Sequence, residues 1–377
     1  MAVVLGRKTA RWALVAAAAA VLCAIPSVVA SLPVGSAHLT PQQLQRRIAD
    51  SGTQPYGGYA QTQSELGLPN LPALGNVTSL LSGISNVRVW YRAANENRVD
   101  VIDTIGERDL YQSPDGDFTW DYGTQVLTEI VGEQSVRLPQ ASDLLPPDLA
   151  RRVLAMDPVD RPVSLPPRRI AGIDADGIRL RPTDPATTVG QVDIWADPAN
   201  GLPLRVELTA RGAQKPIIVS KFMNLTLGAP DPADVRPPDT GNLAQARPPD
   251  IASIIAQFNR FPLPDELAGY QRQPQLAGLP GIARYGAGVA TFVLLPLPRN
   301  IGSSAFDTVS KNGGKMVPVV FGQAELIQIP LLTVMLYQVG FGRRHLTFLL
   351  AGFVNPTVLQ QATTDLSQQP FRFRRPR

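Results

Sequence analysis

A group of four carboxylates falls within a short stretch that we expect to form two neighbouring strands: Asp100, Asp103, Glu107 and Asp109. Carboxyl groups about 5 to 9 Å apart can work as an acid and a base in hydrolysis. Arg98 and Arg108 are interleaved with these acids, so the pattern favours cross-strand ion pairs on the surface over catalysis. No spacing in the group resembles a calcium-binding loop, which makes a metal site the weaker interpretation.

Other residues that could perform chemistry are scarce. The only cysteine is Cys23 and the only histidines are His38 and His345, which excludes a disulfide framework and a Cys/His zinc cluster. The same scarcity leaves no obvious Cys–His or Ser–His–Asp arrangement. The glycines in 286–288 lack the third glycine of a phosphate-binding loop and lead into a strand. We therefore predict that the chain is not an enzyme and needs no cofactor or metal.

The charge of the chain is concentrated at its ends. The net charge is +4, yet residues 1–30 are basic without acids, and four arginines fall in the tail 369–377, so the remainder is slightly acidic. This distribution is not that of a nucleic-acid-binding protein, and we expect no nucleic-acid partner. Hydrophobic residues make up 44% of the sequence, enough for a core, and the 36 prolines favour short elements over a helical bundle.

The amino terminus has the pattern of an export signal. A basic start at 7–11 precedes an uncharged stretch over 12–30, which ends in small residues suited to cleavage after Ala30, and 35–37 offers a second cleavage site. Nineteen apolar residues also nearly span a bilayer, so an uncleaved membrane anchor is the competing interpretation. In both cases the body lies outside the cytoplasmic membrane, because the basic start stays in the cytoplasm.

The next region, 38–228, is expected to be a sheet with two helices. Thr40, Pro41 and Gln43 form a capped helix start, and Leu44 and Ile48 share one helix face. A second helix is expected over 148–156. Short alternating segments separated by turns predict an antiparallel meander: 56–66, 87–92, 97–103, 108–113, 117–123, 124–131, 168–173, 176–182, 190–197, 202–210 and 217–227.

A proline-rich linker over 229–249 is followed by a smaller α+β domain over 250–368. In this domain we expect helices at 250–259, 301–311 and 356–367, and strands at 283–295, 316–321, 324–329, 331–338 and 345–354. The apolar stretches 293–297 and 327–339 fit a small core, or a docking face for a partner.

Several strings in this order resemble one family. They are YGGYAQTQ, RVWYR, NRVDVI, GERDLY, WDY, GIRLRP and DIWADPANGLPLRVE. The chain resembles the MucB/RseB-type regulators of extracytoplasmic sigma factors and, more distantly, the LolA/LolB lipoprotein carriers. The string from Trp195 to Arg205 is the most telling, although Asn200 and Gly201 would stabilise such a hairpin in any sheet. The proline content and the arginine-rich tail are typical of an actinobacterial variant.

The resemblance implies an α+β fold, in which a curved antiparallel sheet forms an unclosed half-barrel around helices. It implies an apolar cavity for an acyl chain or another lipid, and a membrane-bound anti-sigma factor as partner. The chain would then regulate an envelope-stress system. The alternative is a lipid or lipoprotein carrier of the LolA type, for which the second domain is not needed.

Alternation along the strands supplies candidate positions for the inner face of this cavity. They are Val89, Tyr91, Val99, Val101, Phe118, Trp120, Tyr122, Ile178, Leu180, Val192, Ile194, Leu204, Val206 and Leu208. Trp90 and Trp195 could line the same cavity, although aromatic residues in half-buried strands more often form plain core or cross-strand pairs.

Overall fold

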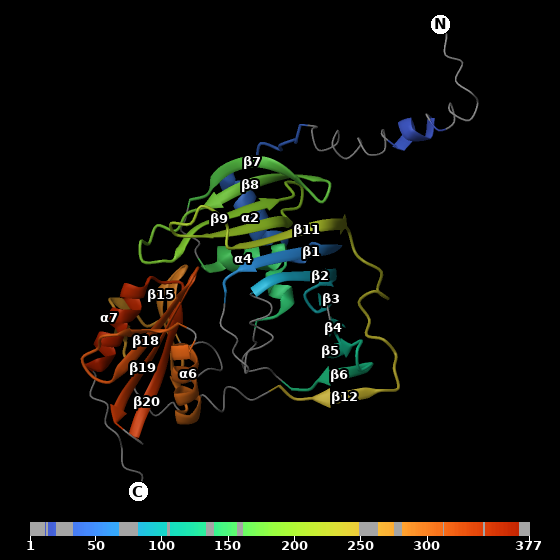
Figure 1. Cartoon of the computed structure of the whole chain (residues 1–377). Coiled ribbons are helices and arrows are strands. Elements are labelled where there is room, and N and C mark those ends of the chain that lie inside the picture. The colour runs from blue at the N-terminus through green and yellow to red at the C-terminus, as the bar shows by residue number, and fades with distance from the viewer. Residues whose placement is uncertain are drawn as a thin grey trace.

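The computed structural model describes residues 12, 14–19, 33–67, 82–103, 106–132, 139–156, 161–248, 263–274, 281–311, 313–341 and 344–368. These residues form a large curved sheet of twelve strands and a second sheet of six strands that lies beside it (Figure 1). The predicted α+β fold with an unclosed half-barrel and a smaller second sheet domain is confirmed. Within the described part of the chain, no helix has the length and apolarity needed to cross a membrane. Most of the expected export signal, and the basic tail, lie outside the described residues.

The helix expected at the start of the large domain forms as the sequence predicts. Helix α2 spans Pro41–Asp50, with Thr40 and Gln43 forming a reciprocal capping box before it. Leu44 and Ile48 are its buried residues, four positions apart on one face. A short 3-10 turn, η1, follows over Ser51–Thr53. The cap satisfies backbone N–H groups that the helix itself leaves unpaired, so the helix start is determined locally.

The large sheet has the order β12-β6-β5-β4-β3-β2-β1-β11-β10-β9-β8-β7. Its strands are β1 Tyr56–Glu65, β2 Ser82–Ala93, β3 Glu96–Asp103, β4 Gly106–Ser113, β5 Gly116–Asp121, β6 Val126–Ile130, β7 Val163–Ile170, β8 Ile173–Leu180, β9 Val189–Ala196, β10 Pro203–Ala210, β11 Ile218–Leu227 and β12 Leu243–Ala246. Pairing is antiparallel between sequence neighbours, as the meander predicts, and β1 joins the two halves by pairing with β11.

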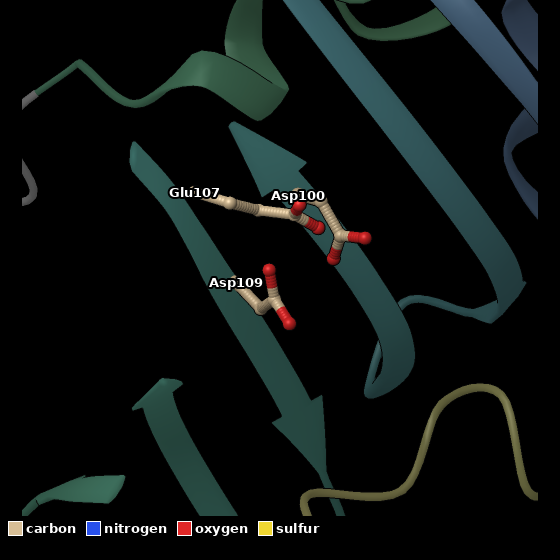
Figure 2. A group of neighbouring side chains, drawn as sticks. All are labelled: Asp100, Glu107 and Asp109. Atoms are coloured by element: carbon tan, nitrogen blue, oxygen red, sulfur yellow. The ribbon is translucent and has the colours of Figure 1, made fainter. Parts of the chain in front are cut away.

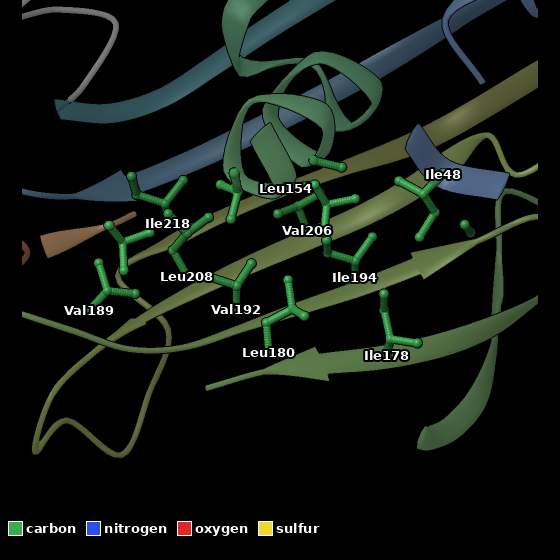
Figure 3. Close-up of a cluster of buried hydrophobic side chains, with 14 of the residues drawn as sticks. Ile48, Leu154, Ile178, Leu180, Val189, Val192, Ile194, Val206, Leu208 and Ile218 are labelled. Atoms are coloured by element: carbon green, nitrogen blue, oxygen red, sulfur yellow. The ribbon is translucent and has the colours of Figure 1, made fainter. Parts of the chain in front are cut away.

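Together with α2, two further helical segments cover one face of this sheet. They are η3 over Ala141–Leu144 and α4 over Pro146–Met156, and α4 contacts β10, β11 and α2. We call the face against which α2 and α4 pack the inner face, and the opposite one the outer face. Figure 3 shows α4 lying across the aliphatic side chains of the inner face.

One strand expected in the large sheet is wrong. The segment 168–173 crosses the turn between β7 and β8, where Ala171 and Gly172 have φ values of 49° and 83°. Glycine adopts this left-handed conformation without strain, and the turn therefore ends β7 at Ile170. The apolar residues on both sides of the turn hid it in the sequence pattern.

The segment expected to be a linker contributes a strand to the large sheet. Residues 243–246 form β12, which pairs in parallel with β6 at the edge of the sheet. Before it, Val235 is 3% exposed, and the carbonyl of Pro230 accepts a hydrogen bond from Arg92. The segment therefore packs along the sheet and covers one of its edges.

The second domain contains a six-stranded sheet of order β15-β16-β20-β19-β18-β17, with a two-stranded ribbon of β13 and β14. Its elements are β13 Glu266–Leu267, β14 Tyr270–Gln271, β15 Ala283–Ala287, β16 Ala290–Leu297, α6 Arg299–Lys311, β17 Lys315–Val317, β18 Gln323–Ile329, β19 Leu332–Phe341, β20 Arg344–Gly352 and α7 Pro356–Ser367. The expected strand over 283–295 is a hairpin, because the chain turns after Ala287. The expected helix over 250–259 lies outside the described residues.

Candidate functional site

The inner face of the large sheet gathers most of the cavity candidates. One group of six is at most 9% exposed and packs under α2 and α4: Ile178, Leu180, Val192, Ile194, Val206 and Leu208. From the helices, Leu44, Ile48 and Leu154 fill the same cluster. The inner face is therefore a packed core. A bound acyl chain would have to displace side chains of the helices and fill their space with its own methylene groups.

A second group continues the inner face toward β2 and β3. Val89, Val99 and Leu204 are buried there, and Tyr91 and Val101 pack against them. The hydroxyl of Tyr91 donates to the carbonyl oxygen of Gly52 at 2.6 Å, which ties β2 to the end of the first helix. Eleven of the fourteen candidates thus lie in two adjoining clusters.

The remaining three candidates do not share this face. In the ladder, Phe118 pairs with Tyr111 and Tyr111 with Arg98, whereas Val99 pairs with Leu110. Directly paired residues point to the same side of a sheet, so the β5 aromatics Phe118 and Trp120 lie on the outer face. Beyond the end of β5, Tyr122 is 49% exposed and meets Trp120 edge-on, with ring centroids 5.9 Å apart. The expectation that aromatic positions point inward is wrong here.

The outer face of β3 and β4 holds the carboxylate group. Arg98 donates to Asp100 at 2.6 and 3.0 Å and to Asp109 at 2.8 Å. Both aspartates are fully buried, and Glu107 lies beside them (Figure 2). The predicted cross-strand ion pairs are present, but the surface location is wrong for Asp100 and Asp109.

Aromatic rings explain this burial. Arg98 is paired across the sheet with Trp90 on one side and Tyr111 on the other, and its guanidinium lies 4.7 and 5.3 Å from the two ring centroids. The Tyr111 hydroxyl also donates to Asp109 at 3.2 Å. The rings exclude water, while the guanidinium supplies charge-assisted hydrogen bonds to the acids.

The cluster carries more negative than positive charge. Burial raises the pKa of Asp100 to about 7, although the neighbouring Arg98 acts in the opposite direction. Burial likewise raises the pKa of Asp109, whose Oδ1 oxygen has no hydrogen-bond partner within the described structure. Such a group can hold a proton near neutral pH, because one carboxyl is more stable neutral than charged beside the other.

The same group is the one set of possible metal ligands among the described residues: Asp100, Glu107 and Asp109, with ligand oxygens within 4.8 Å of one another. Both oxygens of Asp100 already accept hydrogen bonds from Arg98. The guanidinium therefore occupies the position of the positive charge, and the donor set does not fit a dedicated metal site.

A hollow of about 460 Å³ lies on the outer face, next to this cluster. Gly57 pairs with Trp90 on β2 and with Thr226 on β11, so the missing side chain leaves a gap in the face. Pro230 and Asp234, from the segment that follows β11, close one side. Trp90 thus lines this outer hollow and not the inner face.

Trp195 belongs to the core. It is 2% exposed, its Nε1 donates to the carbonyl of Pro166 at 3.0 Å, and Arg168 stacks 4.0 Å from the ring centroid. Gly177 lies beneath the indole, where a Cβ would meet its Nε1 at 2.6 Å. The hairpin string that carried the family resemblance therefore has a packing role in this sheet.

Sequence reasoning missed the contact between the two domains. Before β9, Thr187 Oγ1 donates to the carbonyl of Phe353 at 2.8 Å, and Thr188 Oγ1 donates to that of Leu331 at 2.5 Å. The backbone N–H of Asn355 donates to the carbonyl of Ala186 at 2.7 Å. A pair of threonines before a strand has no distinctive pattern, so only the fold reveals this contact.

Comparison with known proteins gives similarities of fold. No family model and no curated protein matches the chain. A crystal structure of MucB in complex with MucA(peri) has 15% identity, covers 86% of this chain and 97% of that chain, and gives a TM-score of 0.47. The structure of the MucA/MucB complex of Pseudomonas aeruginosa has 14% identity, covers 86% of this chain and 96% of that chain, and gives a TM-score of 0.46.

A LolA superfamily protein from Nitrosomonas europaea covers 53% of this chain and 98% of its own, with 13% identity and a TM-score of 0.24. Structures of MucB and of a LolA superfamily protein are thus among the solved structures to which the chain is similar.

Proposed function

We propose that the chain is an exported, non-enzymatic binding protein that regulates an envelope-stress system. In this proposal the large sheet senses an acyl chain or similar lipid, and the molecule binds a membrane-bound anti-sigma factor. The class of partner is taken from the family resemblance in the sequence, and MucB is found bound to MucA in two of the similar structures.

The observation that carries the proposal is the continuity between the inner face and the second domain. Val289 and Leu331 of the second domain belong to the same buried cluster as Val192 and Ile194 on β9. The threonine contacts at Thr188 and its neighbour fix the start of that strand to the second sheet. A ligand that displaces inner-face side chains would therefore change packing at the domain boundary.

Such a connection suits a sensor better than a carrier. A carrier needs only a cavity that opens and closes, whereas a sensor must make partner binding depend on ligand binding. The two-domain contact offers that dependence, because two packed arrangements of one cluster can favour different partners. The scarcity of catalytic residue types in the sequence agrees with a binding role.

The test is capture of the tagged full chain from the membranes of its own source, followed by identification of bound proteins and native mass spectrometry of bound lipid. We expect a membrane protein with a sigma-factor-binding region, and a lipid whose presence changes the amount of that protein captured. A bound lipid without any membrane protein would favour the LolA-type carrier. The absence of both, with unchanged envelope-stress transcription in a deletion strain, would sink the proposal.

A further inference from the structure

A short loop of the second domain presents large apolar side chains to solvent. Met316 on β17 is 64% exposed, and Val320 and Phe321, in the turn before β18, are 62% and 61% exposed. We call residues 316–321 the apolar loop. Single exposed apolar residues are common on proteins, whereas three such large side chains within six residues are unusual.

The backbone of the loop is held in place, so this exposure is built into the fold. The carbonyl of Phe321 accepts a hydrogen bond at 3.0 Å from the hydroxyl of Tyr337, a fully buried residue. Gly322 follows with φ +85°, and the carbonyl of Gln338 takes the space where a side chain would begin. Val319 packs inward against the core of the domain. The loop cannot turn its outer side chains inward without losing these contacts.

Along the chain, the exposed charged residues nearest to the apolar loop are lysines. Lys311 at the end of α6 and Lys315 at the start of β17 are both exposed. The nearest acids along the chain are Asp307, one helical turn before Lys311, and Glu325, which is buried opposite Met316 in the ladder. Between those two acids the sequence has only the lysines as charged residues.

Three apolar side chains flanked by lysines are too few for a specific protein interface, which usually needs about 800 Å² from each partner. They are sufficient for the surface of a bilayer, where apolar side chains enter the acyl boundary and basic groups meet anionic headgroups. We infer that the apolar loop inserts into the interface of an anionic membrane and so orients the second domain on it. This inference does not depend on the anti-sigma partner.

The experiment places a fluorescent reporter in the loop of the full chain. Cys23→Ser removes the native thiol, and Val320→Cys carries an environment-sensitive label. Gln361→Cys, on the exposed side of α7, is the matched control. Each labelled chain is reconstituted in vesicles of phosphatidylcholine alone or with half phosphatidylglycerol, and quenching by nitroxide-labelled lipids is measured.

In anionic vesicles we expect at least a threefold stronger lipid quenching at position 320 than at position 361. Lys311→Gln with Lys315→Gln should remove most of this difference, and so should high salt, with an unchanged melting temperature. Equal quenching at the two positions would overturn the inference. Shielding at position 320 that rises with protein concentration and ignores lipid would also overturn it, and would assign the loop to a second copy of the chain.

Discussion

The two halves of the large sheet share an apolar inner face but differ in how charged groups are grouped on the outer face. Across β8 to β10 the inner face is aliphatic and rests on α2 and α4, while charged pairs such as Arg179–Asp193 lie on the outer face. Across β3 and β4 the outer face itself buries charge, around Arg98 and two aspartates. One sheet therefore carries a packed apolar core on one side and a buried polar cluster on the other.

The difference shows what each half can respond to. An aliphatic cluster is stabilised by the apolar surface that it removes from water, so the loss of a few methyl groups should weaken it. A cluster in which two buried aspartates share one guanidinium responds to protons, because burial disfavours the charged forms of Asp100 and Asp109. Substitutions in each half should reveal whether the two halves differ in this way.

The largest effect is expected at Arg98. Arg98→Met should lower the free energy of unfolding at pH 8 by about 3 to 5 kcal/mol, because Asp100 and Asp109 would remain buried without their cation. Arg108→Met removes an ion pair to Asp121 that is half exposed, and should cost less than about 1 kcal/mol. Urea unfolding of both variants measures the difference. Equal costs would show that burial does not make the ion pairs of Arg98 more important for stability than the exposed pair of Arg108.

The second largest effect is expected from a substitution in the core of the inner face. Ile194→Ala should lower the free energy of unfolding by about 2 to 5 kcal/mol, since Ile194 is fully buried beneath the helices. Ile84→Ala makes the same change on β2, where the side chain is 62% exposed, and should fall within about 0.5 kcal/mol of the native protein. A small cost at Ile194 would indicate an inner face that is already loosely packed and ready for a ligand.

The domain contact should give a smaller effect. Thr188→Val removes the hydrogen bond to Leu331 and leaves a buried carbonyl unpaired, which should cost about 1 to 3 kcal/mol. Calorimetry should show the two domains unfolding less cooperatively. Thr226→Val, at an exposed position on β11, is the control and should change neither quantity. An unchanged single transition in Thr188→Val would remove the proposed link between the domains.

The smallest effect concerns pH. Because the pKa of Asp100 is raised to about 7 by burial, the folded chain binds more protons than the unfolded chain between the two pKa values. Asp100 therefore contributes stability that is full below about pH 4 and is lost as the pH rises through about 7. Between pH 5 and pH 8 the native protein should lose on the order of 1 kcal/mol relative to Asp100→Asn.

Melting temperatures at four pH values in this range test the sign. Asp121→Asn is the control: hydrogen bonds from Thr124 lower the pKa of Asp121, so its contribution disappears only below pH 4, roughly. Above pH 5, the melting temperature of Asp121→Asn should change with pH as that of the native protein does. A slope for Asp100→Asn that also matches would mean that Asp100 stays charged in the fold.

Much of the fold could be predicted because its signals are local. The capping box at Thr40 and Gln43 determines a helix start through neighbouring residues alone. The alternation Leu204, Val206, Leu208 gave a half-buried strand that the structure contains. The candidate site was predicted less well. The arginine and the acids were identified as ion pairs, but their burial depends on Trp90 and Tyr111, which reach Arg98 only through strand pairing.

Strand β5 shows the same difference between what local sequence predicts and what strand pairing decides. Phe118 and Trp120 alternate with polar residues, so the sequence determined that they share one face, but alternation cannot say which face that is. Pairing with β4 decided it, because register is a property of two strands together. By itself the sequence determined helix starts, strand periodicity and the absence of the usual catalytic residue combinations. Only the tertiary structure decided which face is covered by helices, which charges lose their water, and how the turn at Thr188 joins the two domains. Each of these depends on residues far apart in the chain.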